Sequence, residues 1–177
     1  MKIDKIGLGG GCHWCTEAVF QNLKGVARVE QGWISASGAV EFSEAVLVHF
    51  NPEKISIKDL IEIHLRTHKS TSSHSMRSKY RSAVYVFNSK QLLESEQISR
   101  LLQKEFEENI ITKVYRFEEF KMSPEPYQNY YKKNPEKPFC KTYIDPKLQL
   151  LQRRFPKNVM ETKLSSIKKG EEQNIKK

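Results

Sequence analysis

The sequence predicts an α+β fold, a two-layer sandwich in which helices pack on a mixed β-sheet with a ferredoxin-like core and a loop-rich C-terminus. Three observations lead to this prediction. Patterns typical of strands and helices alternate in the order strand, helix, strand, strand, helix, strand, helix, strand. Two neighbouring strands, residues 26–34 and 45–50, are close enough in the chain to form a hairpin. The length of 177 residues and the hydrophobic fraction of 38% suffice for one packed domain.

The first half of the chain supplies five elements of this fold. A short strand leads into three consecutive glycines, and an amphipathic helix follows and ends at Gly25. The strand at 45–50 ends at Asn51-Pro52, and Ser56 then caps a second helix. The expected elements are a strand at 5–8, a helix at 12–23, strands at 26–34 and 45–50, and a helix at 57–68.

The second half supplies the remaining elements after a polar stretch at 69–79. We expect a strand at 82–87, a helix that is capped by Ser89 and runs to about Glu107, a strand at 113–117, and helical pieces within 125–133 and 145–155. Residues 1–155 are thus predicted to form a single domain. Residues 156–177 are rich in lysine and poor in apolar side chains, which predicts a mobile tail.

Composition excludes several classes of protein. The formal net charge is +9, but the basic residues are spread along the chain without a nucleic-acid motif, so we expect no nucleic-acid partner. No segment has the apolar length of a membrane span or the h-region of a signal peptide. Three cysteines without an export signal indicate reduced thiols, which favours a cytoplasmic protein. We expect a monomer.

Cys12 and Cys15 form a C-x-x-C pair at the start of the first predicted helix. Such a pair can be a redox couple of the thioredoxin type, half of a zinc site, or one nucleophile beside a bystander. His64 and His68 are four residues apart on a helix, but they lie too far from the cysteines in sequence for a zinc finger, and we predict no metal. A helix N-terminus favours the thiolate at Cys12 in particular.

Five stretches resemble, in order, the motifs of A-class peptide methionine sulfoxide reductases, peptide-methionine (S)-S-oxide reductases. The motifs are G-C-F-W-x-x-E, G-Y-x-G-G, G-H-A-E-V-V-x-V-x-Y-D-P, Q-Y-R-S and H-Q-x-Y-x-x-K-N-P-x-G-Y-C. The matching stretches are "GCHWCTEAVF", "QGWISASG", "EFSEAVLVHFNP", "SKYRSAVYVF" and "YQNYYKKNPEKPFC". The resemblance covers roughly residues 5–145.

The resemblance implies an enzyme that reduces the S epimer of methionine sulfoxide, free or in oxidised proteins, to methionine. It assigns Cys12 as the nucleophile that attacks the sulfoxide sulfur and Glu44 as the acid that protonates the oxygen. Tyr80 is implied to donate a hydrogen bond to that oxygen.

The resemblance also implies three substrate-binding residues, namely His13, Trp14 and Trp33. His13 stands where the family has phenylalanine, which makes the pocket for the substrate methyl group more polar. Trp33 replaces the tyrosine of G-Y-x-G-G. Ser75 takes the place of the family's aspartate before the Q-Y-R-S tyrosine, so the polar network around the oxygen must differ.

The reduction leaves Cys12 as a sulfenic acid, which a second thiol converts to a disulfide. The resemblance assigns Cys140 as this resolving cysteine, and thioredoxin then reduces the disulfide without any bound cofactor. Cys15 is an alternative resolving thiol. A thioredoxin-like thiol-disulfide oxidoreductase using Cys12 and Cys15 remains the alternative function.

Overall fold

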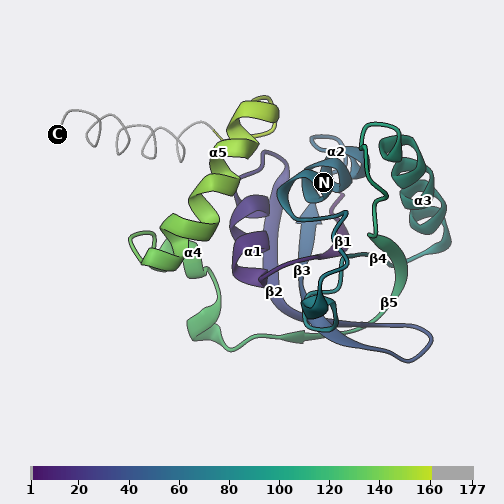
Figure 1. Cartoon of the computed structure of the whole chain (residues 1–177), viewed down its shortest axis with the longest axis horizontal. Helices are drawn as coiled ribbons and strands as arrows, with labels where there is room; N and C mark the ends of the chain where they lie inside the picture. The colour runs from purple at the N-terminus through teal and green to yellow at the C-terminus, as the bar shows by residue number, and fades with distance from the viewer. Residues whose placement is uncertain (1, 161–177) are drawn as a thin grey trace.

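The computed structural model describes residues 2–160. Its elements follow the predicted order through the first eight (Figure 1). They are β1 (Asp4–Gly9), α1 (His13–Gln21), β2 (Val26–Ala36), β3 (Val40–Phe50), α2 (Ile57–Thr67), β4 (Ala83–Val86), α3 (Ser89–Gln103) and β5 (Lys113–Met122). The C-terminal part adds α4 (Tyr130–Lys133), a π-helix (Cys140–Ile144) and α5 (Asp145–Arg154), and the 3₁₀ turns are Ser75–Ser78 and Glu125–Tyr127.

Side-chain caps fix where two of the helices begin. Ser56 Oγ accepts a hydrogen bond from the Asp59 amide at 3.0 Å, as the sequence predicts for α2. In α3 the cap is Asn88, whose Oδ1 accepts from the Gln91 amide at 2.8 Å, and not Ser89. Asparagine and serine are comparably good N-caps, so the sequence pattern alone did not choose between these neighbours.

The sheet is mixed, as predicted, and it closes into a barrel with the strand order β1-β3-β2-β5-β4. The hairpin of β2 and β3 is confirmed, and β4 and β5 form the parallel pair. The predicted two-layer sandwich and ferredoxin-like core are not confirmed. The reason is that β5 pairs with both β2 and β4, which joins the two edges that an open sheet would leave free.

Side chains of β3 alternate between the two faces of this sheet. Val46, Val48 and Phe50 belong to the large core under the helices, whereas Ala45 and Leu47 belong to a smaller cluster with residues of β2 and β4. The small cluster is Ile34, Ala36, Ala45, Leu47, Ala83 and Tyr85. Apolar side chains therefore pack on both faces of β3, and α1 lies along β2 and β3 (Figure 1).

The C-terminal part was predicted to be rich in loops, but it contains α4, the π-helix and α5. These three helices pack near α1. Residues just beyond the predicted domain end also contact the domain. Val159 is 3% exposed and forms a bridge with Leu23, and the Met160 amide donates to the Asn22 carbonyl at 3.0 Å. Most of the predicted tail, residues 161–177, lies outside the described residues. Within residues 2–160 no helix has the length and apolar character to cross a membrane.

Candidate active site

Cys12 lies at the N-cap of α1, directly after the glycine turn that follows β1. The turn needs glycine at position 10, because a Cβ there would lie 2.4 Å from the His68 ring. The Cys12 carbonyl accepts the first backbone hydrogen bonds of the helix, from Cys15 at 3.1 Å and Thr16 at 3.2 Å. The half-buried sulfur therefore sits at the positive end of the helix.

The pKa of Cys12 is lowered below its ordinary value of 9.0. The largest cause is a hydrogen bond from the Cys15 thiol, and burial opposes it. The backbone amides of Trp14 and Cys15 lower the pKa further, whereas the nearby negative charge of Glu44 raises it. Cys15 itself is buried, and its pKa is raised because it donates to Cys12 and is desolvated. Of this C-x-x-C pair, Cys12 is thus the thiol that ionises more readily, and Cys15 is the hydrogen-bond donor.

Glu44 lies on β3 directly opposite Trp33 of β2 and is only 6% exposed. Its Oε1 is 3.3 Å from His13 Nε2, and its Oε2 is 3.8 Å from Lys79 Nζ. Oε2 is buried and has no hydrogen-bond partner within residues 2–160. A buried carboxylate oxygen without a partner is available to a substrate atom.

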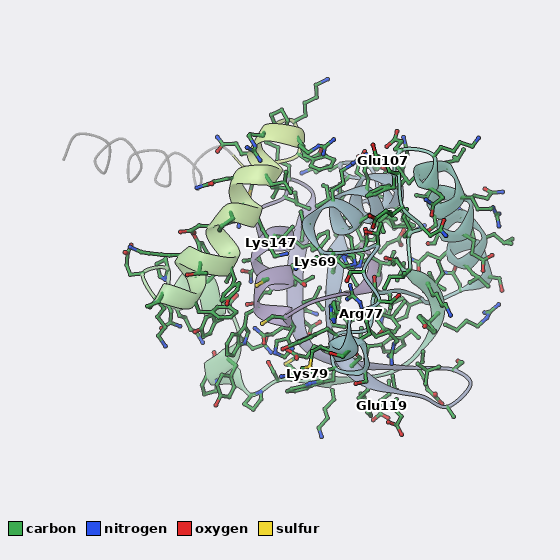
Figure 2. All side chains as sticks on the ribbon, viewed as in Figure 1. Lys69, Arg77, Lys79, Glu107, Glu119 and Lys147 are labelled. Atoms are coloured by element: carbon green, nitrogen blue, oxygen red, sulfur yellow. The ribbon has the colours of Figure 1, made fainter. Side chains whose placement is uncertain are left out.

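The segment that carries Tyr80 is fastened to β3 beside Glu44. The Lys79 carbonyl accepts from the Glu44 amide at 3.1 Å and from Ser43 Oγ at 2.9 Å, and Ser43 Oγ accepts from the Arg81 amide at 2.8 Å. These bonds bring Lys79, which is labelled in Figure 2, close to Glu44. The Tyr80 hydroxyl is the main cause that raises the pKa of Lys79, and Glu44 adds to it. Tyr80 and Glu44 therefore both border the Lys79 ammonium group.

Arg77 connects this segment to the turn before Cys12. Its Nη1 donates to the carbonyls of Gly10 and Tyr80, each at 2.9 Å. One guanidinium therefore holds the nucleophile turn and the Tyr80 backbone together. Ser75, at the family's aspartate position, is exposed at the start of the 3₁₀ turn Ser75–Ser78.

His13, Trp33 and Trp14 surround the start of α1. His13 is buried, its Nδ1 donates to the Gly32 carbonyl at 2.9 Å, and its ring meets the Trp33 ring edge-on at 5.3 Å. Trp14 stacks on Tyr130 with ring centroids 4.0 Å apart and planes 4° apart. His13 and Trp33 are adjacent to Glu44, whereas Trp14 is packed against the C-terminal part.

Cys140 opens the π-helix and is 0% exposed. Burial is the main cause that raises its pKa, and Asp145 adds to it. Cys140 and Cys15 belong to one core cluster, against which Cys12 packs, and all three thiols are free. The sequence suggested a mobile loop here, but Cys140 and Ile144 of the π-helix belong to the large core, and the π-helix contacts α1.

Glu17 is a residue of the site region to which the sequence analysis assigned no role. It is 0% exposed and accepts from Gln31 Nε2 at 3.0 Å, the Asn129 amide at 3.0 Å and the Tyr130 amide at 3.1 Å. Burial raises its pKa, against the effect of these hydrogen bonds. The signal was present, because Glu17 is the glutamate of the G-C-F-W-x-x-E resemblance.

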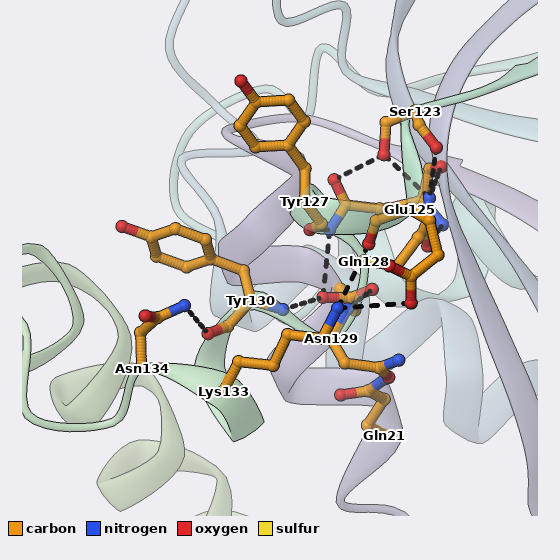
Figure 3. A network of polar contacts seen from close by, with 11 residues as sticks. Gln21, Ser123, Glu125, Tyr127, Gln128, Asn129, Tyr130, Lys133 and Asn134 are labelled. Atoms are coloured by element: carbon orange, nitrogen blue, oxygen red, sulfur yellow. Dashed lines mark hydrogen bonds and ion pairs between the residues drawn. The ribbon is translucent and has the colours of Figure 1, made fainter.

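Gln128 adds a second attachment of the C-terminal part to β2 (Figure 3). Its Nε2 donates to the Gln31 carbonyl at 2.8 Å and to Ser123 Oγ at 2.7 Å, and its Oε1 accepts from the Gln31 amide at 3.2 Å. Glu17 and Gln128 together hold the start of the C-terminal part against α1 and β2.

His64 and His68 do not converge with the cysteines. Their rings stack on each other at 4.2 Å, and His68 Nε2 bonds Ser82 Oγ at 2.7 Å. Residues 2–160 contain no group of three or more histidine, cysteine or acidic side chains placed to hold a metal ion.

Comparison with known proteins agrees with this geometry. The family model described as peptide methionine sulfoxide reductase matches residues 4–159. The chain is 35% identical to the peptide methionine sulfoxide reductase MsrA of Trichodesmium erythraeum, over 89% of this chain and 98% of that protein.

Solved structures show the same fold. The reduced form of Mxr1 from Saccharomyces cerevisiae aligns with a TM-score of 0.69 at 24% identity, covering 80% of this chain and 91% of that chain. Mxr1 in complex with Trx2 aligns with a TM-score of 0.56 at 21% identity, covering 73% of this chain and 85% of that chain. The family model matches most of this chain, and the MsrA of Trichodesmium erythraeum is 35% identical to it. The chain therefore belongs to the peptide methionine sulfoxide reductase family.

Proposed function

We propose that the protein reduces the S epimer of methionine sulfoxide, free or within oxidised proteins, to methionine. The observation that carries the proposal is the pairing of a Cys12 thiol whose pKa is lowered with Glu44, a buried carboxyl that has an unpartnered oxygen. Family membership supports the same reaction, and it does not favour the alternative of a thioredoxin-like oxidoreductase.

The first step is attack of the Cys12 thiolate on the sulfoxide sulfur. Glu44 gives one proton to the sulfoxide oxygen, and the hydroxyl of Tyr80 donates a hydrogen bond to it. Attack forms a bond between the two sulfur atoms. The protonated oxygen then passes from the substrate sulfur to the Cys12 sulfur as the sulfur–oxygen and sulfur–sulfur bonds break, which leaves Cys12 as a sulfenic acid and releases the methionine thioether. The thiolate, the sulfoxide and one proton thus become a sulfenic acid and a thioether.

His13, Trp14 and Trp33 are proposed to bind the substrate side chain. His13 and Trp33 stand next to Glu44, so they are placed to contact the sulfoxide group. Trp14 offers a flat apolar surface, but part of it is covered by Tyr130.

The second step forms a disulfide and releases water. We propose Cys140 as the resolving thiol, because it belongs to the core cluster against which Cys12 packs. One observation favours Cys15 as a second candidate, because its thiol already donates to the Cys12 sulfur. Trapping the oxidised protein with one equivalent of sulfoxide and mapping its disulfide by mass spectrometry distinguishes the two.

Thioredoxin is proposed as the reductant of that disulfide, by thiol–disulfide exchange and without a bound cofactor. The structure of the relative Mxr1 in complex with Trx2 supports this choice. The three free thiols are consistent with a reducing compartment such as the cytoplasm. The monomeric state and the lack of a nucleic-acid partner stay predictions.

An epimer-resolved assay with dithiothreitol as reductant tests the proposal. The wild-type protein is expected to consume the S epimer of methionine sulfoxide and leave the R epimer. Cys12→Ser should abolish turnover, and Glu44→Gln should slow it by about 100-fold, as for loss of a general acid. Glu41→Gln, the same change at an exposed position of β3, is the matched control. If the wild-type protein left both epimers intact, the proposed function would be wrong.

A further inference from the structure

We propose that an apolar groove beside Glu44 binds the side chain of a large apolar residue that lies two positions from methionine sulfoxide in a polypeptide. The inference rests on the proposed function and narrows its substrate class to methionine sulfoxide within peptides and unfolded protein segments of this kind. Free methionine sulfoxide has no neighbouring residue, so it reaches only the site around Cys12 and Glu44.

The groove has a volume of about 460 Å³ and is lined by Trp33, Phe42, Lys121, Met122 and Pro124. Phe42 is 41% exposed and Met122 is 52% exposed, so both present apolar surface to water. The one charged side chain of the lining, Lys121, has an aliphatic stem that covers apolar surface while its ammonium group stays in water. An apolar side chain that enters the groove therefore removes apolar surface from water on both partners.

Trp33 joins the groove to the candidate active site. It pairs with Glu44 across β2 and β3, and its ring contacts the His13 ring. Phe42 lies two residues before Glu44 on β3, so the two side chains are on the same face of the sheet. Two residues of a strand span about 7 Å. The groove thus begins one strand repeat from the proposed proton donor.

The same repeat governs an extended peptide. Its side chains alternate between two sides, so residues two positions apart lie on one side with a separation of about 7 Å. An extended peptide whose methionine sulfoxide reaches Glu44 therefore holds the side chain two positions away over the groove. The residues directly next to methionine sulfoxide point to the opposite side.

One wall of the groove is held in place by hydrogen bonds. The Ser123 amide donates to the Gln31 carbonyl at 3.1 Å, and Gln128 Nε2 donates to the Ser123 carbonyl at 3.0 Å. The Tyr127 amide donates to the Pro124 carbonyl at 2.9 Å. These bonds fix Pro124 next to β2, so a bound side chain does not have to order this wall.

The size of the groove fits a single side chain better than a second copy of this chain. A stable interface between proteins uses about 20–30 residues on each side. The groove has the five lining residues given above, and exposed charged residues, Glu41 and Lys121, are the sequence neighbours of Phe42 and Met122. An apolar surface of this extent, continuous with a site for methionine sulfoxide, suits one residue of the substrate.

Steady-state kinetics with blocked pentapeptides test the proposal. The reference peptide has the S epimer of methionine sulfoxide at its centre and alanine elsewhere, and leucine replaces each alanine in turn. Leucine two positions before or two positions after the sulfoxide should raise kcat/KM by about 10-fold, because added methylenes gain that factor in an apolar pocket. Leucine directly next to the sulfoxide should change kcat/KM by less than about 2-fold, because it faces away.

Phe42→Thr and Met122→Thr each remove one apolar wall at an exposed strand position, where threonine is well tolerated. In each variant the leucine advantage should fall to about 3-fold or less, while kcat/KM for free methionine sulfoxide stays within about 2-fold of wild type. Ile3→Thr is the matched control. Ile3 is 45% exposed and precedes Asp4, which pairs with Phe50 at the other end of β3, so this variant should keep the full advantage.

A binding measurement needs no turnover. In Cys12→Ser protein with ¹³C-labelled methionine methyl groups, the preferred leucine peptide should shift the Met122 methyl resonance more than the alanine peptide does. Met160, whose amide bonds the Asn22 carbonyl, is the internal control and should not shift.

Several outcomes would overturn the proposal. They are equal kcat/KM for the alanine peptide and the peptides with leucine two positions away, a leucine advantage that survives both Phe42→Thr and Met122→Thr, and a Met122 resonance that no peptide shifts. A dimer in sedimentation that both substitutions dissociate would assign the groove to a second copy and overturn it as well. If the wild type reduced neither free nor peptide-bound methionine sulfoxide, the proposed function itself would fail.

Discussion

Glu17→Ala is the perturbation that best tests how the C-terminal part is attached. The carboxyl accepts three hydrogen bonds. Alanine leaves the Asn129 and Tyr130 amides without a partner, whereas Gln31 Nε2 keeps its hydrogen bond to the Tyr127 carbonyl. An unpaired buried donor costs about 1–3 kcal/mol. We take the lower value for each, because Asn129 and Tyr130 are half-buried and reach water when the segment shifts. The expected loss in the free energy of unfolding, from these two unpaired amides, is about 2 kcal/mol.

Urea unfolding followed by circular dichroism measures this loss as a lower midpoint with an unchanged slope. Glu107→Ala, at an exposed position after α3, is the control and should remain within about 0.5 kcal/mol of wild type. Limited proteolysis should cleave Glu17→Ala faster than the control within residues 123–144. A Glu17→Ala protein as stable as Glu107→Ala, with equal protease resistance, would refute the assigned role.

Two further predictions concern protonation. Cys15→Ala should raise the pKa of Cys12, since the Cys15 thiol is the largest cause that lowers it, and the pH dependence of iodoacetamide alkylation of Cys12 should shift upward. Cys140→Ala should leave that dependence unchanged, and an equal shift in both variants would contradict the Cys15 contact. Burial lowers the pKa of His68 from 6.5 to about 4, so the unfolded imidazole binds a proton in this range while the folded one does not. The free energy of unfolding should therefore fall as the pH is lowered from 6.5 to 4. His68 should contribute about 2 kcal/mol to this fall, after allowance for its partial exposure. In urea unfolding measured across this pH range, His68→Gln should show a smaller pH dependence than the wild type.

The order of the elements was predictable because it depends on local patterns. The amphipathic spacing in α2 and its Ser56 cap are contained in a dozen consecutive residues. Barrel closure was not predictable in this way. It depends on β5 pairing with β2 and with β4, and no local pattern records which distant strands pair.

The candidate site was predictable to the same extent. The motifs named Cys12 and Glu44, but the contact of Glu44 with His13 depends on how α1 packs on β3. Cys140 was expected in a loop because its neighbours are proline and lysine. Its burial comes from contact with α5 and with α1, and α1 lies more than a hundred residues before Cys140 in the sequence. The role of Glu17 was not predictable for the same reason, because its hydrogen-bond partners, the amides of residues 129 and 130, are also more than a hundred residues away in the sequence.

Closure of the barrel has a consequence for how the protein tolerates its proposed substrates. Oxidised proteins are often partly unfolded, and their exposed strands add readily to any sheet edge with free amides and carbonyls. Each of the five described strands here has a hydrogen-bonded neighbour on both sides. A damaged chain that presents a methionine sulfoxide to Cys12 therefore meets, within residues 2–160, no strand that is open along its whole length.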